Sequence, residues 1–280
     1  MKPLVEVLLA TTTFFKARGI PSARLDAELL IGDALGLDRV HVYLAFDRPL
    51  VEAELEAIRA RVRRRGNREP LAWIVGKREF YGRDFVVGPG VLVPRPDTET
   101  IIEALLPHLG DDAPLFVADV GSGSGCIGLT LAAEKPGVRL FAIDVSEPAL
   151  QFTRQNVEKL GLKERVAVLR GPDLDPVPPT RPLDWVVSNP PYISSADLDA
   201  LEPEVRDHEP RVALDGGPDG LAPYRRLAPA AAARARRGVA FEVGFGQAEA
   251  VAALVRDAGF AQVEVVRDLA GVDRVVIGQR

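Results

Sequence analysis

The sequence is poor in the residues that form disulfides and metal centres. It holds a single cysteine, Cys126, which excludes an internal disulfide framework. Its three histidines, at positions 41, 108 and 208, are scattered without the spacing of metal ligands. We therefore expect a cytoplasmic protein that binds no metal.

Long apolar runs are missing as well. No stretch approaches the roughly 20 apolar residues of a membrane-spanning helix, and the first residues lack the apolar region of a signal peptide. The 280 residues are 47% hydrophobic and 27% charged, which suits one medium domain and one smaller domain. Net charge is +3 over residues 1–85 and −8 over residues 86–280. We expect no membrane partner, and the acidic larger part argues against a stable complex with nucleic acid.

The N-terminal part of the chain predicts a small helical bundle. Apolar residues recur at helical spacing in four segments, at 2–19, 22–36, 39–46 and 51–65. The last segment runs into a set of arginines: Arg59, Arg61, Arg63, Arg64, Arg65 and Arg68. Such a set is most often a solvated helix face, and otherwise it docks an acidic protein surface or RNA.

A change of hydrophobic period marks the end of the bundle. Between residues 76 and 93, apolar residues alternate around a Gly-Pro-Gly stretch at 88–90, which predicts a β-hairpin. We therefore place the helical bundle in residues 1–85, a β-hairpin linker in residues 86–97 and the main domain in residues 98–280.

The main domain alternates between strands and helices. Strands are predicted at 115–120, 138–143, 166–169, 185–188, 239–243, 262–267 and 273–277. Helices are predicted before and between them at 97–109, 126–134, 146–160, 224–237 and 247–258. Parallel strands need crossover helices, so the first five strands predict a parallel sheet, and the last two are close enough to pair antiparallel. The fold class is α/β: a Rossmann-like sheet of seven strands, preceded by the bundle and the hairpin.

A glycine-rich loop follows the first predicted strand. It reads Gly-Ser-Gly-Ser-Gly at 121–125, and Asp119 leads into it. Glycines let a backbone approach a ligand closely, and the helix behind the loop offers unpaired N–H groups. Asp144 ends the next strand at the distance expected of an acid that binds both hydroxyls of a ribose. The pattern predicts a nucleoside ligand, either a nicotinamide dinucleotide or S-adenosylmethionine. No hydride-transfer partner is visible, which favours the methyl donor.

The strand at 185–188 runs directly into Asn189-Pro190-Pro191-Tyr192. Two prolines fix φ twice and remove two backbone donors, which leaves the carbonyls of Asn189 and Pro190 free to accept hydrogen bonds. An amide oxygen, a backbone carbonyl and an aromatic ring together suit a planar group that carries an NH₂. The oxygens would take its two protons and Tyr192 would stack on its face. Taken alone, such a loop is equally often a stiff surface turn.

Several motifs together resemble one family. They are the glycine loop, Asp144, the Asn-Pro-Pro-Tyr loop, Val-Pro-Arg-Pro-Asp-Thr-Glu at 93–99, Asp-Gly-Leu at 219–221 with Tyr224 and Arg225, and residues 268–274. They resemble the bacterial methyltransferases that modify the glutamine of the Gly-Gly-Gln motif in class I peptide chain release factors, over nearly the whole chain. The resemblance implies S-adenosylmethionine as donor and S-adenosylhomocysteine as product. It also implies a release factor as substrate, docked between the main domain and the bundle, and nothing in the chain demands a dimer.

The resemblance also assigns roles by position. The residues implied in binding the donor are Asp119, Gly121, Ser122, Gly123, Ser124, Gly125, Asp144, Asp173, Leu174 and Asn189. The target amide would be held by Asn189, Pro190, Pro191 and Tyr192. Arg95 either contacts the substrate or ties the linker to the domain. Such enzymes often carry an aromatic residue beside the adenine, where this chain has Leu174, which predicts plain apolar contact.

Positioning is the first need of this reaction, because the lone pair of a glutamine amide nitrogen is delocalised into its carbonyl. We expect Asn189 Oδ1 and the Pro190 carbonyl to accept the two amide protons, and Tyr192 to clamp the amide plane. No strong base is required, since the proton leaves after the methyl group arrives. Glu242, which follows the fifth strand, either approaches this pocket or is a solvated strand end.

Three other functions fit parts of the pattern. A methyltransferase for an exocyclic amine of adenine or guanine would use the same loop on a flipped base. The acidic main domain, and the lack of a separate basic domain, argue against that function. A nicotinamide oxidoreductase and a non-catalytic nucleoside-binding module are the remaining alternatives.

Overall fold

The computed structural model of this protein describes residues 2–110 and 114–280. Its internal contacts divide the chain into two compact units. The first unit consists of Met1–Lys77 and Glu202–His208, and the second of Arg78–Leu201 and Glu209–Arg280. A short segment from the second half of the sequence therefore belongs to the first unit.

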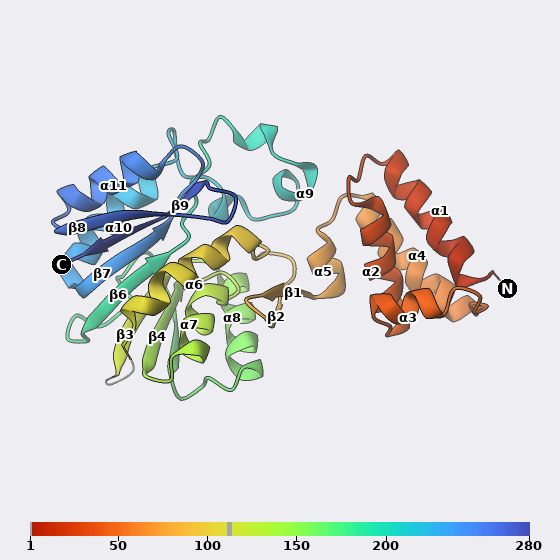
Figure 1. Cartoon of the computed structure of the whole chain (residues 1–280), viewed down its shortest axis with the longest axis horizontal. Coiled ribbons are helices and arrows are strands. Elements are labelled where there is room, and N and C mark those ends of the chain that lie inside the picture. The colour runs from red at the N-terminus through yellow and green to blue at the C-terminus, as the bar shows by residue number, and fades with distance from the viewer. Residues whose placement is uncertain (1, 111–113) are drawn as a thin grey trace. The chain divides into compact units, whose positions relative to one another are not determined.

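The first unit is the helical bundle that the sequence predicts (Figure 1). Its helices are α1 (Leu4–Ala17), α2 (Ala23–Leu35), α3 (Arg39–Leu44), α4 (Glu52–Gly66), α5 (Leu71–Val75) and α9 (Pro203–Arg206). The four predicted segments are helical because their apolar faces meet in one core that includes Leu8, Phe15 and Leu30. The sequence does not predict α5, because Pro70 suggests a break. Pro70 instead occupies the N-cap position, where a missing N–H is harmless.

Partly buried ion pairs attach the segment 202–208 to the bundle. Arg65 is 5% exposed; its Nε donates to Asp26 Oδ2 at 2.6 Å and its Nη2 donates to Glu204 Oε1 at 2.8 Å. Arg68 donates to the other oxygen of Glu204 at 2.5 Å. These two arginines are thus structural and do not form a solvated face. Three more arginines of the predicted run pair with acids of the bundle: Arg59 with Glu52 and Glu56, Arg61 with Asp33, and Arg64 with Glu69.

A two-stranded hairpin, β1 (Lys77–Phe80) and β2 (Arg83–Val86), follows the bundle. A hairpin is predicted, but its predicted position is wrong, because it precedes residues 86–97 and turns at Tyr81 and Gly82. Both turn residues have positive φ, 50° and 72°, as a tight hairpin turn requires.

The Gly-Pro-Gly stretch at 88–90 makes a turn, although not the turn of the hairpin: the Val91 amide donates to the Gly88 carbonyl at 3.3 Å, and Gly90 has φ of 93°. It lies against α8 (Glu147–Lys159), and a Cβ atom on Gly88 would come within 2.7 Å of the Phe152 ring. Only glycine leaves room for that ring. The glycines that form this turn therefore also let the backbone approach a neighbouring helix.

The second unit is built on a seven-stranded sheet whose order is β5-β4-β3-β6-β7-β9-β8. The strands are β3 (Leu115–Val120), β4 (Val138–Asp144), β5 (Val166–Arg170), β6 (Leu183–Ser188), β7 (Ala235–Glu242), β8 (Gln262–Arg267) and β9 (Asp273–Gln279). The first five are parallel, and β9 pairs antiparallel with both β7 and β8. The predicted α/β class with a Rossmann-like sheet is confirmed. β7 begins earlier than predicted, because Ala235 already pairs with Leu183.

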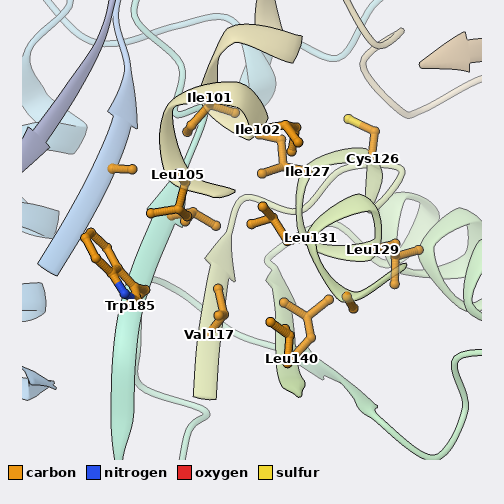
Figure 2. Close-up of a cluster of buried hydrophobic side chains, with 14 of the residues drawn as sticks. Ile101, Ile102, Leu105, Val117, Cys126, Ile127, Leu129, Leu131, Leu140 and Trp185 are labelled. Atoms are coloured by element: carbon orange, nitrogen blue, oxygen red, sulfur yellow. The ribbon is translucent and has the colours of Figure 1, made fainter. Parts of the chain in front are cut away.

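Helices cover both faces of this sheet (Figure 1). They are α6 (Glu99–Leu105), α7 (Cys126–Glu134), α8, α10 (Ala222–Arg234) and α11 (Ala248–Asp257). On one face, Ile102 and Leu105 of α6 and Leu131 of α7 gather over Val117 and Trp185 of the strands (Figure 2). Burial on both faces explains why the strands read as nearly continuous apolar runs. In the described part of the chain, every helix is too short or too polar to cross a bilayer.

The sheet has a topological switch point between β3 and β6. β3 pairs with β4 on one side and with β6 on the other, so the connections that leave β3 and β6 diverge to opposite faces. In open α/β sheets, ligands bind beside the carboxyl ends of strands at such a point. The loop after β3 is the glycine loop, and the loop after β6 is Asn-Pro-Pro-Tyr.

Candidate active site

A cavity of about 270 Å³ opens at this switch point. Ten of the predicted site residues line it: Arg95, Gly121, Ser122, Gly123, Ser124, Asp144, Asp173, Asn189, Pro190 and Pro191. The other predicted site residues, Asp119, Gly125, Leu174 and Tyr192, do not line it. The structure therefore brings the donor loop and the Asn-Pro-Pro corner to one cavity, and four of the expected contacts are not part of its lining.

The glycine loop is shaped by backbone bonds to β4. The amides of Gly121 and Ser122 both donate to the Ile143 carbonyl, at 2.8 and 2.9 Å. Gly121, Gly123 and Gly125 have φ of 72°, 58° and 84°, a region that suits glycine. A Cβ on Gly121 would meet no atom within 4 Å, whereas a Cβ on Gly125 would lie 2.8 Å from a methyl group of Leu129. Gly121 thus borders open space, and Gly125 packs the loop onto α7.

Asp144 closes the loop from the neighbouring strand. Its Oδ2 accepts from the Gly123 amide at 2.9 Å, and its Oδ1 accepts from the Ser146 amide at 2.9 Å. Burial raises the pKa of Asp144, and these two amide bonds act in the opposite direction by favouring the charged form. Each carboxylate oxygen keeps a further lone pair, so Asp144 is oriented to accept from two hydroxyls in the cavity.

Asp119 supports the loop from beneath. It is fully buried, and its Oδ2 accepts from the Gly128 amide of α7 at 2.9 Å. Its Oδ1 has no hydrogen-bond partner among the described residues. Burial raises the pKa of Asp119 to about 7. The geometry assigns it a place under the loop rather than in the cavity wall.

Asn156 of α8 is a loop support that sequence reasoning missed. It is fully buried, and its Nδ2 donates to the carbonyls of Ser124 and Val86 at 2.9 and 3.0 Å. Its Oδ1 accepts from the Val86 amide at 2.7 Å. One side chain therefore ties the donor loop to β2. The only sign of this role in the sequence is that Asn156 is a polar residue on the apolar face of the amphipathic α8.

The Asn-Pro-Pro corner is held by groups from two other elements. Ser188 Oγ donates to the Val120 carbonyl at 2.6 Å and joins the ends of β6 and β3. Asn189 Nδ2 donates to Thr98 Oγ1 at 3.2 Å. Thr98 belongs to the short 3-10 helix Pro96–Thr98 and is 2% exposed. With Nδ2 so engaged, Oδ1 is the amide atom of Asn189 left to accept a hydrogen bond from a ligand.

Tyr192, which ends the corner, is partly buried. Its carbonyl accepts from Gln247 Nε2 at 2.9 Å, and Gln247 Oε1 accepts in turn from the Gly244 amide at 3.0 Å. The ring packs against the hydrophobic cluster on the α10 and α11 face of the sheet. Burial raises the pKa of Tyr192 to about 12, so the phenol stays neutral. Its expected stacking on a target amide stays a prediction.

Two ion pairs form the rim of the cavity. Arg95 Nη2 donates to both oxygens of Glu209, at 2.8 and 2.9 Å, and Glu209 is 6% exposed. Arg226 donates to both oxygens of Asp173 at 3.2 Å. Arg95 therefore ties the segment between β2 and α6 to Glu209. Its contact with substrate stays a prediction.

Leu174 departs from its expected place. It is 3% exposed and belongs to the hydrophobic cluster that also contains Val177 and Leu183. The preceding residue, Asp173, has φ of 48°, which turns the chain so that the next side chain enters the core. Contact between Leu174 and an adenine therefore has no support in this geometry.

The chain matches two family models. Residues 6–76 match the PrmC N-terminal domain, and residues 94–203 match the methyltransferase small domain. A release factor glutamine methyltransferase from Geobacter sulfurreducens is 45% identical to it, over 98% of this chain and 95% of that protein. The chain belongs to the release factor glutamine methyltransferase family. The resemblance drawn from its motifs is confirmed.

Other comparisons agree with the release factor glutamine methyltransferase family and its fold. A second member, from Caulobacter vibrioides, is 40% identical over 98% of this chain and 96% of its own length. The catalytic domain of human METTL16, solved with hairpin 6 of the MAT2A 3'UTR, superimposes with a TM-score of 0.56. That likeness spans 74% of this chain and 79% of the human one at 18% identity, so it shows the fold alone.

Metal ligands are not grouped in the described part of this family member. Among residues 2–110 and 114–280, no three His, Cys, Asp or Glu side chains are placed to share an ion. The expectation that the protein works without a metal stays a prediction.

Proposed function

We propose that this protein transfers a methyl group from S-adenosylmethionine to the side-chain amide nitrogen of the glutamine in the Gly-Gly-Gln motif of class I peptide chain release factors. Family membership supports the reaction and the substrate. The observation that carries the proposal is geometric: Asn189 and Pro190 line the same cavity as Asp144 and the glycine loop. A donor and an acceptor bound there would meet.

The cavity residues fit a nucleoside donor. Asp144 offers two carboxylate oxygens to ribose hydroxyls, and charge-assisted bonds of this kind are worth about 1.5–3 kcal/mol each. The open space beside Gly121 admits a ligand against the backbone. When bound, S-adenosylmethionine supplies a sulfonium-activated methyl group, and S-adenosylhomocysteine is the product.

The corner residues fit a flat carboxamide. Asn189 Oδ1 and the Pro190 carbonyl would accept the two protons of the target amide, which draws its nitrogen out of conjugation and directs the lone pair into the cavity. With a donor bound, the nitrogen–carbon bond would form as the carbon–sulfur bond breaks, and the amide nitrogen would then release a proton to water. Both prolines lack N–H groups, so the corner presents acceptors without competing backbone donors.

Substrate docking and assembly state complete the proposal. Residues 1–85 would bind the release factor, and the chain would act as a monomer. The same corner would also accept the exocyclic amine of a flipped base, which makes nucleic acid the necessary comparison.

A labelling assay tests the proposed function. Purified protein is incubated with S-adenosylmethionine carrying a radiolabelled methyl group and one acceptor at a time: a class I release factor, the same factor with Ala in place of the Gly-Gly-Gln glutamine, total RNA, or DNA. We expect label in the first sample alone. Label in RNA or DNA, or equal label in the Ala-bearing factor, would overturn the proposal.

A further inference from the structure

Glu242 is a buried carboxylate beside the catalytic corner that the reaction above does not use. It ends β7 and is 1% exposed, so it is not a solvated strand end. Ser188 pairs with Phe241 across β6 and β7, which sets Asn189 beside Glu242 at the next position. Its Oε2 has no hydrogen-bond partner in the described chain.

Three side chains share hydrogen bonds at this point. Asn189 Nδ2 donates to Thr98 Oγ1 at 3.2 Å. Hydrogen bonding by the Thr98 and Asn189 side chains acts to lower the pKa of the Glu242 carboxyl, so both side chains favour its charged form. Glu242 is therefore the carboxylate of this cluster, buried beside the Asn189–Thr98 pair.

A hydroxyl by itself cannot fix the direction of the Asn189 amide. Thr98 Oγ1 can accept from Nδ2 or donate to Oδ1, and the terminal torsion of asparagine is broad and nearly two-fold. A carboxylate is an acceptor only. Once the Thr98 hydroxyl donates its hydrogen bond to the Glu242 carboxylate, Thr98 Oγ1 can only accept from Asn189. The Nδ2 of Asn189 must then face inward, and its Oδ1 must face the cavity.

We propose that Glu242 is a positioning residue that sets the orientation of the Asn189 amide and so keeps Oδ1 directed at the target amide. The inference deepens the proposed function and rests on it. In the flipped orientation, Asn189 would present N–H groups to the N–H groups of the substrate. That orientation loses the acceptor on which the transfer depends.

The ionisation of Glu242 gives this role a pH signature. Burial raises its pKa to about 7, while Thr98, Arg274 and Asn189 favour the charged form and Asp97 opposes it. Two phenols also face it: Tyr224, whose hydroxyl donates to the Glu242 carbonyl at 2.8 Å, and Tyr192. Protonated Glu242 can donate to Thr98, and the direction of the cluster is then lost. Turnover should fall below about pH 7, with donor affinity unchanged.

The variant Glu242→Gln tests the inference, because it keeps the size of the side chain and adds a donor. We expect kcat for release factor methylation to fall roughly 10- to 100-fold, the usual cost of losing a residue that orients a functional group. The Kd for S-adenosylmethionine should not change, and the fall in kcat below pH 7 should disappear. Glu264→Gln on β8 is the matched control and should behave as wild type.

A second variant separates orientation from general damage. Asn189→Asp presents an oxygen in either orientation, so adding Glu242→Gln to it should cost nothing. The kcat of the double variant should exceed that of Asn189→Asp, because only one of two neighbouring carboxylates remains. An equal loss in both backgrounds, or full kcat and an unchanged pH profile in Glu242→Gln, would overturn the inference. Wild-type protein that methylates no release factor would instead overturn the proposed function.

Discussion

The amide of Gly123 donates to the Asp144 carboxylate at 2.9 Å, so the donor loop and the acid proposed to bind ribose are one hydrogen-bonded unit. Asp144→Ala should therefore weaken donor binding by at least about tenfold, the equivalent of one charge-assisted bond. Calorimetric titration with S-adenosylmethionine measures this effect. Glu158→Ala, on the exposed side of α8, is the control, and equal affinities in the two variants would remove Asp144 from the donor site.

Asn189→Ala should leave the donor in place and damage the chemistry. Loss of one preorganised group at a reacting centre costs about 10²–10³ in turnover, and Asn189 Oδ1 is such a group if it holds the target amide. Single-turnover methylation and donor titration measure the two effects separately. Asn67→Ala, at an exposed position in the first unit, controls for the substitution itself. An Asn189→Ala protein with full turnover would contradict the role of the corner.

Asp119 should make folding stability depend on pH. Its pKa is raised by burial from 3.8 to about 7, so its contribution is fully present below pH 3.8 and is lost as the pH rises through 7. Each unit of such a shift is worth about 1.4 kcal/mol. Relative to wild type, Asp119→Asn should therefore gain on the order of 2 kcal/mol in free energy of unfolding between pH 5 and pH 8. Urea titrations at the two pH values measure it, and a constant difference would show that Asp119 is ionised in the folded protein.

Arg95→Ala should lower the free energy of unfolding, because it leaves Glu209 buried without its partner. Arg95 is 38% exposed, so solvent screening limits the expected cost to about 1–3 kcal/mol. The cost should shrink in a Glu209→Gln background, and a double-mutant cycle of urea unfolding measures that coupling. KM for the release factor separates the two roles left open by the sequence: a rise in Arg95→Ala that Glu209→Gln does not share would indicate contact with substrate.

Asn156→Leu should loosen the donor loop without touching the donor. The change keeps the approximate size of the side chain but removes three hydrogen bonds and leaves the Val86 amide and the Ser124 carbonyl unpaired. We expect a loss of roughly 2–4 kcal/mol in unfolding free energy and weaker donor binding. Gln151→Leu, on the exposed face of the same helix, is the control. Unchanged donor affinity would show that the loop holds its shape without Asn156.

The sheet and the donor loop were predictable because their signals are local. β-α-β units leave apolar strands next to helical periods, and the parallel pairing of β3 with β4 places Asp144 beside the loop without further information. The Asn-Pro-Pro corner was equally predictable from the sequence, since two prolines fix the backbone whatever surrounds them.

The supports of the site were not predictable, because they join residues far apart in the chain. Asn156 bonds to Val86 across 70 positions, and Arg95 bonds to Glu209 across 114. The residues next to Asn156 and Arg95 in the sequence do not indicate which distant residue each one bonds to. Leu174 failed for a different reason: a single positive φ at Asp173 decides which way the following side chain points.

The origin of the segment 202–208 limits how this protein can be divided. Arg65 and Arg68 of the helical bundle are neutralised by Glu204, which is encoded more than a hundred residues later. A fragment that stops at residue 77 would keep the Arg65–Asp26 pair but would leave Arg65 Nη2 and Arg68 without the Glu204 carboxylate. Chimaeras between relatives would have to exchange residues 1–77 and 202–208 together. Substitutions in these two segments are therefore expected to accumulate together in evolution.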